Sequence, residues 1–170
     1  MNKLLKSTNE MADHTVFVAN WLKKLNLWNK GPNSTIYNGS NKKIFYIRNK
    51  KKKLPIKLVT HHWSNNYMKG FKVYKKINDL IEKSYWKKKI EFTYIGNLPK
   101  GFKFKNVKVI RPLNQKRLSS KISEHHIYVT GSICEPGGNH QNEGALCGLP
   151  ILYLNSGCFP EYCKGYGVKF

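Results

Sequence analysis

Arginine is scarce in this sequence, although basic residues are abundant. Of the 31 lysine and arginine residues, only Arg48, Arg111 and Arg117 are arginine, and 9 acidic residues leave a net charge of +22. Proteins that read nucleic acid specifically favour the paired contacts of the arginine guanidinium, so we expect no specific nucleic acid partner. The codon bias of a low-GC genome explains the excess of lysine and asparagine. The charge still favours anions in general, including nucleotide diphosphates and anionic membrane surfaces.

Cysteines are few and long apolar runs are missing. The four cysteines are Cys134, Cys147, Cys158 and Cys163. They form no Cys-x-x-Cys pair and have no histidine at zinc-finger spacing, so we expect free thiols in a reducing compartment and no metal site. No run approaches the ~18 apolar residues of a membrane span, and residues 1–10 lack the apolar core of a signal peptide. We therefore expect a cytoplasmic protein, with the inner face of a membrane as a location that the lysines favour.

The chain length bounds the number of domains. A sequence of 170 residues, 40% of them hydrophobic, is long enough for one folded domain with a sizeable core. It is too short for two complete domains of ordinary size. An enzyme that needs two domains would therefore be incomplete here.

From residue 55 onward the sequence alternates regularly between strand and helix patterns. The expected strands are 56–60, 92–95, 107–110, 127–130 and 151–154, and the expected helices are 71–88, 114–123 and 139–147. Helices inserted between short strands rich in Val, Ile and Tyr predict an α/β fold, a Rossmann-like doubly wound parallel sheet. Ligands of such sheets bind outside the carboxyl ends of the strands, so the loops after Thr60, Ile95, Ile110 and Thr130 are the candidate site.

Before residue 55 the pattern is less regular. Residues 15–19 and 34–37 read as short strands, and Asn20 reads as the N-cap of a helix over residues 21–27. The basic run Lys50–Lys53 reads as a solvated linker. We expect the main domain to span residues 55–170, with residues 1–54 in front of it.

The loop after the fourth expected strand carries unusual chemistry. Residues 131–150 read GSICEPGGNHQNEGALCGLP. Gly137 and Gly138 let the backbone approach a ligand, and a helix capped by Asn139 would point free N–H groups at an anion. Glu135 and Glu143 flank this stretch eight positions apart, where each could accept hydrogen bonds from sugar hydroxyls. A nucleotide sugar has hydroxyls on both sides of its diphosphate and fits this arrangement.

The pattern E-P-G-G-N-x-x-x-E-x-x-x-C-G-L-P resembles the Glu-x7-Glu signature of the GT4 branch of GT-B glycosyltransferases. Downstream, SGCFPE at 156–161 and GYGV at 165–168 resemble further glycine segments of that family. Upstream, ADHTVFVANWLKK at 12–24 and STIYNGS at 34–40 resemble the crossover from the family's acceptor domain to its donor domain. The resemblance covers nearly the whole chain.

This resemblance implies a donor-binding domain of a retaining glycosyltransferase, which transfers a hexose from a nucleotide diphosphate sugar to a glycan or lipid-linked acceptor without a metal or other cofactor. It implies that Glu135 contacts the donor sugar and that Glu143 contacts the ribose. The donor phosphates would lie on residues 137–142, where His140 would contact the ligand through its backbone alone. Residues 1–54 would be a remnant of the N-terminal domain with its crossover linker.

The first loop, THHWSNNYMKG at 60–70, lies where the family has Gly-Arg-x4-Lys-Gly. Lys69 matches the lysine that neutralises the departing diphosphate, which makes Lys69 and Glu135 the expected catalytic residues. Ser64 stands at the arginine position and brings a hydroxyl without a charge. Arg111 is expected beside the nucleobase. Trp63 reads either as a ring that stacks on a ligand or as a buried packing residue.

The histidine pairs His61–His62 and His125–His126 have no carboxylate or third ligand at metal-binding spacing. We therefore expect them to be loop or strand-end residues.

Three interpretations stay open for the chain as a whole. It could be a fragment, a degenerate copy or one half of a split enzyme whose acceptor domain is a separate chain, and we expect no full activity from this chain alone. A non-catalytic nucleotide-sugar binder would keep Glu143 and Lys69 but need no acceptor site. A basic polyanion-binding or membrane-associated protein would be insensitive to Glu143→Ala and steeply weakened by salt.

Overall fold

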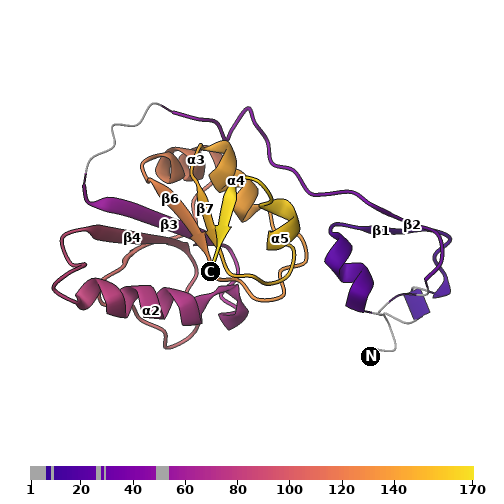
Figure 1. Ribbon diagram of the computed structural model, residues 1–170, viewed down its shortest axis with the longest axis horizontal. Coiled ribbons are helices and arrows are strands. Elements are labelled where there is room, and N and C mark those ends of the chain that lie inside the picture. Colours follow the sequence, from indigo (N-terminus) through magenta and orange to yellow (C-terminus); the bar gives the residue numbers. More distant parts are fainter. Residues whose placement is uncertain (1–6, 9, 26–27, 29, 49–53) are drawn as a thin grey trace.

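Six parallel strands form the main sheet in the described part of the chain (Figure 1). The computed structural model describes residues 7–8, 10–25, 28, 30–48 and 54–170. The strands are β3 (Ile56–His62), β4 (Ile90–Gly96), β5 (Lys108–Ile110), β6 (Ile127–Thr130), β7 (Ile151–Tyr153) and β8 (Gly167–Lys169), in the order β5-β4-β3-β6-β7-β8. Counted from β3, this is the order 3-2-1-4-5-6 of the Rossmann fold. The predicted doubly wound parallel sheet is confirmed.

Helices cover both faces of this sheet because neighbouring strand residues point to opposite sides. Leu58 packs in a core with α2 (Phe71–Glu82), whereas Val59 packs in a second core with residues of α3 (Gln115–Ser123) and α5 (Phe159–Tyr162). Figure 1 shows α2 on one side of the sheet, and α3, α4 (His140–Leu146) and α5 on the other. The sheet is therefore buried on both faces, as its runs of apolar residues require.

The start of α3 agrees with the prediction, whereas the end of α2 differs from it. Asn114 caps α3, since its side chain accepts a hydrogen bond from the Arg117 amide at 3.0 Å. Helix α2 ends at Glu82, six residues before the predicted end, because Lys83 is extended. Tyr85, which the prediction placed in this helix, lies beyond its end and is 62% exposed, and the Lys89 ammonium lies 3.5 Å from the centre of its ring.

The sequence did not predict β8 or α5. Strand β8 is three residues long and pairs in parallel with β7, where Ile151 lies opposite Gly167 and Tyr153 opposite Lys169. Helix α5 is four residues long and has Pro160 in its first turn. Elements this short carry too little periodicity to stand out from the surrounding turns.

The part before residue 55 contains a small parallel pair, β1 (Thr15–Phe17) and β2 (Asn33–Thr35), and a 3-10 helix, η1 (Asn20–Leu25). Both strands were predicted, with somewhat longer spans. The predicted N-cap role of Asn20 is wrong, because its side-chain oxygen accepts a hydrogen bond from the Thr35 hydroxyl at 2.8 Å. The end of the predicted helix at residues 26–27 and the basic run Lys50–Lys53 lie outside the described residues.

Residues before position 55 pack directly onto the α/β domain. Ala19 and Phe45 are fully buried in the core that contains Val59. The Arg48 guanidinium donates to the hydroxyls of Ser119 and Ser123 at 3.0 and 2.8 Å, and the stretch that carries it passes over α3 and α4 in Figure 1. The division of the chain at residue 54 stays a prediction. Among the described residues, no helix is both long and apolar enough to cross a membrane.

Candidate functional site

A cavity of about 400 Å³ lies at the carboxyl ends of β3 and β6, where the strand order reverses. This is the position at which doubly wound sheets bind ligands, and the volume falls in the range of small-molecule sites. The loops after β3, β5 and β6 and the last two residues of β4 contribute to its lining. Seven of the predicted site residues line it together: Ser64, Lys69, Glu135, Gly138, Asn139, His140 and Glu143.

Lys69 and Glu135 form an ion pair in this cavity. The Lys69 ammonium donates to both carboxylate oxygens of Glu135, at 3.0 and 2.7 Å. Lys69 ends the 3-10 helix η2 (Tyr67–Lys69), and the following Gly70 takes a left-handed φ of 99°, where an added Cβ would lie 2.7 Å from the Gly131 backbone. Two residues 66 positions apart are thus held face to face by a turn that only glycine fits.

The backbone around Glu135 is fixed from the other side by the turn before α5. The Cys158 amide donates to the Glu135 carbonyl and the Cys134 amide donates to the Ser156 hydroxyl, both at 2.9 Å. A Cβ at Gly157 would lie only 2.4 Å from the Glu135 nitrogen. Glu135 is buried, with 6% of its surface exposed, and the ion pair with Lys69 offsets the cost of burying its charge.

Glu143 is held by a chain of hydrogen bonds that the sequence did not suggest. His61 Nε2 lies 2.7 Å from Glu143 Oε2, and His61 Nδ1 lies 3.0 Å from the Tyr128 hydroxyl. Burial raises the pKa of Tyr128 well above its usual value, so the phenol keeps its proton beside His61 Nδ1. Because a carboxylate only accepts hydrogen bonds, His61 Nε2 carries a proton and donates to Glu143 Oε2. The expectation of a mere strand-end histidine missed this carboxylate because it lies 82 positions away.

Two further histidines lie beneath the cavity. Burial, followed by the charge of neighbouring groups, lowers the pKa of both His62 and His140 well below 6.5. His62 Nε2 lies 2.7 Å from the Tyr74 hydroxyl, His140 Nε2 lies 3.1 Å from Thr130 Oγ1, and the two rings are 4.6 Å apart between centroids. His140 therefore packs its ring into the domain. Within the described residues, no group of three or more His, Cys, Asp or Glu side chains is arranged to hold a metal ion.

The two glycines of the loop after β6 have different surroundings. A Cβ at Gly138 would lie 2.8 Å from the His140 ring and 3.1 Å from the Glu135 carboxyl carbon, so this glycine keeps the cavity open. Gly137 faces the N-terminal part instead, where a Cβ would lie 2.7 Å from Val18. The predicted capping by Asn139 is wrong: its backbone is helical and its side chain makes no capping hydrogen bond.

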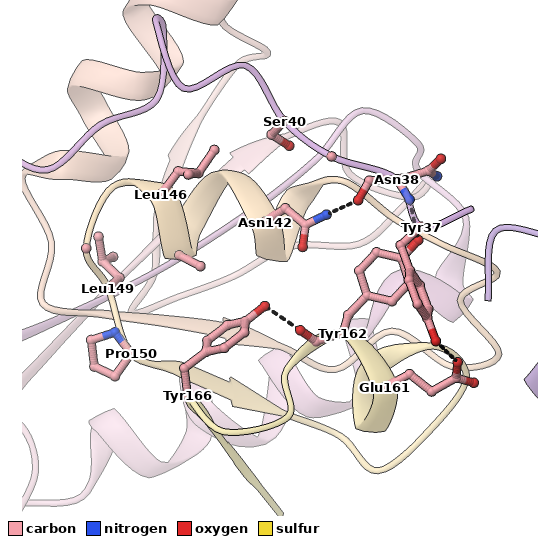
Figure 2. A pocket seen from close by; sticks show the side chains of 13 residues that line it. Tyr37, Asn38, Ser40, Asn142, Leu146, Leu149, Pro150, Glu161, Tyr162 and Tyr166 are labelled. Atoms are coloured by element: carbon pink, nitrogen blue, oxygen red, sulfur yellow. Dashed lines mark hydrogen bonds between the residues drawn. The ribbon is translucent and has the colours of Figure 1, made fainter. Parts of the chain in front are cut away.

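Residues 15–40, here called the crossover segment, hold the backbone of this loop. Three loop carbonyls accept hydrogen bonds from three side chains of the segment. The pairs are Trp21 Nε1 with Pro136, Asn38 Nδ2 with Gly137, and Ser40 Oγ with Asn139. In return, Asn142 of α4 donates to the Asn38 carbonyl at 2.9 Å, as Figure 2 shows. The crossover segment thus fixes the loop from the side opposite to the cavity.

Glu161 of α5 fastens the crossover segment to the domain. Its carboxylate accepts from the amides of Asn20 and Trp21 at 2.8 and 2.6 Å and from the Tyr37 hydroxyl at 3.1 Å (Figure 2). Burial raises the pKa of Glu161, but the hydrogen bonds from the two amides outweigh burial and leave the pKa below its ordinary value. These contacts join residues about 140 positions apart.

Three predicted residues need separate comment. Arg111 is exposed and does not line the cavity, whereas the next residues, Pro112 and Leu113, do. Ser64 lines the cavity, and its hydroxyl accepts a hydrogen bond from the Asn66 amide at 3.1 Å. Trp63 lines the cavity and is 77% exposed, so its interpretation as a buried packing residue is wrong.

The sequence matches no family model and no curated protein. The fold, however, matches solved glycosyltransferase structures. Sucrose-phosphate synthase from Thermosynechococcus elongatus aligns with a TM-score of 0.75 and 17% identity over 96% of this chain and 46% of the other. A glycosyltransferase from Rickettsia africae ESF-5 aligns with a TM-score of 0.72 and 14% identity, over 100% of this chain and 52% of the other. The pneumococcal O-GlcNAc transferase GtfA, solved with UDP and GlcNAc, aligns with a TM-score of 0.70 and 13% identity, over 99% of this chain and 36% of the other.

These likenesses establish the fold, which is that of the C-terminal Rossmann-like half of GT-B glycosyltransferases. The chain spans about half, or less, of the length of each of these proteins.

Proposed function

We propose that this chain is the nucleotide-sugar-binding part of a retaining glycosyltransferase of the GT4 type, which transfers a hexose to a glycan or lipid-linked acceptor. One observation carries the proposal: two carboxylates, each held by its own cationic or N–H donor, face one cavity at the point where the strand order reverses. A donor with hydroxyls on both sides of a diphosphate matches that arrangement, and the fold is one that glycosyltransferases share.

The Lys69–Glu135 pair gives the donor site a defined chemistry. The donor diphosphate would compete for the Lys69 ammonium, and a bound phosphate would leave the Glu135 carboxylate free to accept a hydroxyl of the donor sugar. Lys69 would then stabilise the negative charge that develops on the departing nucleotide diphosphate. We propose that this lysine makes donor binding independent of a metal ion, so binding should be the same with and without a chelator.

The other carboxylate suits the ribose. The Tyr128–His61 chain fixes Glu143 Oε2 and leaves Oε1 to accept hydroxyls of a diol. The cavity wall beside it, formed by Ile95, Pro112 and Leu113, is apolar and suits a nucleobase. Because a neutral apolar wall does not distinguish one base from another, the base must be found by experiment.

The test is calorimetric titration of the chain with UDP-, GDP- and ADP-sugars. We expect one donor to bind, and we expect Glu143→Ala to weaken that binding by about tenfold or more, since a hydrogen bond to a charged group contributes about 1.5–3 kcal/mol. Glu124→Ala is the matched control, because Glu124 is an exposed glutamate, away from both cavities, that pairs with Lys121 at 2.7 Å.

Binding that is equal in the wild type and Glu143→Ala would refute the assignment of the ribose site. Binding without transfer, even when the acceptor domain of a related enzyme is supplied, would favour a non-catalytic nucleotide-sugar binder. Retention of RNA or anionic vesicles that falls steeply with salt, together with no donor binding, would favour a polyanion-binding protein.

A further inference from the structure

A second, larger cavity lies on the opposite face of α4 from the site described above. Its volume is about 820 Å³, and it is an open, groove-like cavity bordered by α4, the crossover segment and the turn that follows α5 (Figure 2). Asn142 and Leu146 of α4 face this cavity, whereas His140 and Glu143 of the same helix face the cavity of about 400 Å³ described above, here called the donor cavity after its proposed ligand. The two spaces are thus separated by the width of one helix, about 10 Å.

The lining of this cavity contains almost no charged side chains, although the protein as a whole is strongly basic. Basic residues make up 31 of the 170 residues, yet the 13 described lining residues include no lysine or arginine. The single charged group, the Glu161 carboxylate, already accepts three hydrogen bonds. A phosphate, a nucleotide or another anion would find no partner here, so the lining suits a neutral ligand.

Three tyrosines supply the walls, and their hydroxyls are already bonded. Tyr37 donates to Glu161 at 3.1 Å, Tyr162 donates to the Val18 carbonyl at 2.6 Å, and Tyr166 donates to the Tyr162 carbonyl at 2.6 Å. The rings of Tyr37 and Tyr166 are half exposed. These bonds hold the rings in place, so that what they offer a ligand is rigid aromatic surface and not a hydroxyl.

The polar groups that remain are hydrogen-bonding side chains without charge. Asn142 uses its Nδ2 on the Asn38 carbonyl, which leaves its Oδ1 directed into the cavity in Figure 2. The Ser40 hydroxyl lies at the rim, where its proton is given to the Asn139 carbonyl and its oxygen can still accept, and Leu149 and Pro150 close the apolar end. Aromatic surface beside an amide oxygen and a hydroxyl matches a molecule with C–H groups on one face and hydroxyls around its edge.

We propose that this cavity is a second binding site, which takes an uncharged saccharide through ring stacking on Tyr166 and Tyr37 and a hydroxyl hydrogen bond to Asn142 Oδ1. The site stands independently of the proposed transferase activity, because it uses the other face of α4 and none of the donor residues. In a transferase it would hold a glycan at a distance from the reacting sugar.

The test is heteronuclear NMR of the labelled chain, titrated to millimolar concentrations of maltotriose, cellotriose and chitotriose. We expect at least one trisaccharide to shift the Asn142 side-chain amide and the Gly148 amide in a saturable way. Tyr166→Ala should weaken that binding about tenfold, while Tyr166→Phe, which keeps the ring, should stay close to the wild type.

Two controls separate this site from the other possibilities. Tyr85→Ala removes an even more exposed tyrosine elsewhere, 62% against 45% for Tyr166, and should change nothing. Glu143→Ala should weaken donor binding about tenfold or more and leave trisaccharide binding intact, so the two proposals can fail separately. The proposal is overturned if no trisaccharide shifts these amides, if the shifts are confined to the donor cavity, or if they follow protein concentration instead of sugar, which would mark an interface between two copies of the chain.

Discussion

Replacing Glu161 by glutamine should loosen the crossover segment. The carboxylate accepts from the Asn20 and Trp21 amides at 2.8 and 2.6 Å, one bond on each oxygen. Glutamine keeps one acceptor oxygen and places an NH2 group against the second amide, so one charge-assisted hydrogen bond is lost. Such a bond contributes about 1.5–3 kcal/mol, and because the carboxylate is partly exposed we expect a loss of about 2 kcal/mol.

Hydrogen exchange at neutral pH measures this loss where it occurs. A decrease of about 2 kcal/mol should speed exchange of the Asn20 and Trp21 amides by about 30-fold. Because the segment also holds the carbonyls of Pro136 and Gly137, exchange in the loop after β6 should rise as well. The amides of α2, on the far face of the sheet, should keep their protection.

Lowering the pH tests whether the charge of the Glu161 carboxylate is what stabilises the crossover segment. The pKa of Glu161 is lowered in the folded protein, so its contribution to stability is complete above its ordinary value of 4.5 and is lost as the pH falls through the lowered value. Wild type and Glu161→Gln should therefore converge in strongly acidic solution. Glu124→Gln, at an exposed i,i+3 pair, should cost about 0.5 kcal/mol or less. Unchanged exchange of Asn20 and Trp21 in Glu161→Gln would refute the role assigned to this carboxylate.

Three further outcomes follow from the donor cavity. Gly138→Ala should weaken donor binding more than it lowers stability. The added methyl would lie 3.1 Å from the Glu135 carboxyl carbon and 2.8 Å from the His140 ring. Calorimetric titration measures the loss of binding, and urea unfolding measures the loss of stability. Lys69→Met should destabilise the fold by about 1–3 kcal/mol, since it leaves a buried carboxylate unpaired, and adding Glu135→Gln should restore part of the loss; equal stability of all three proteins would contradict the pairing. His62 and His140 have lowered pKa values in the folded protein, so unfolding takes up protons below pH 6.5. The free energy of unfolding in urea should therefore fall by up to about 1.4 kcal/mol per pH unit for each histidine as the pH decreases. A flat profile between pH 7 and 5 would speak against neutral, buried rings.

The positions of five of the six strands of the main sheet could be predicted because each is an apolar run between turn-forming residues. Strand β6, with three buried residues in four, shows this directly. A parallel sheet brings the loops that follow its strands to one edge, so the sequence predicts that residues of two distant loops, such as Lys69 and Glu135, share one site. The ion pair between them agrees with that expectation.

What the sequence could not supply were side-chain contacts across long separations. His61 and Glu143 lie on a strand and a helix that have no shared local pattern, and nothing in the spacing of 82 positions indicates that their side chains meet. The same holds for Glu161, which serves as the helix cap that Asn20 was expected to provide. Asn20 has the right residue type for a cap, but tertiary contacts with Thr35 and Tyr37 engage its side chain instead.

The contact between Glu161 and the crossover segment also orders the events of folding. It joins positions about 140 residues apart in a chain of 170, which makes it one of the most non-local contacts in the fold. Contacts of that kind form late, because the entropy of closing so long a loop has to be overcome first. During synthesis, α2 and the strands beside it can pair long before α5 leaves the ribosome. The loop after β6 should therefore acquire its final shape only after α5 has been synthesised, when most of the sheet has already formed.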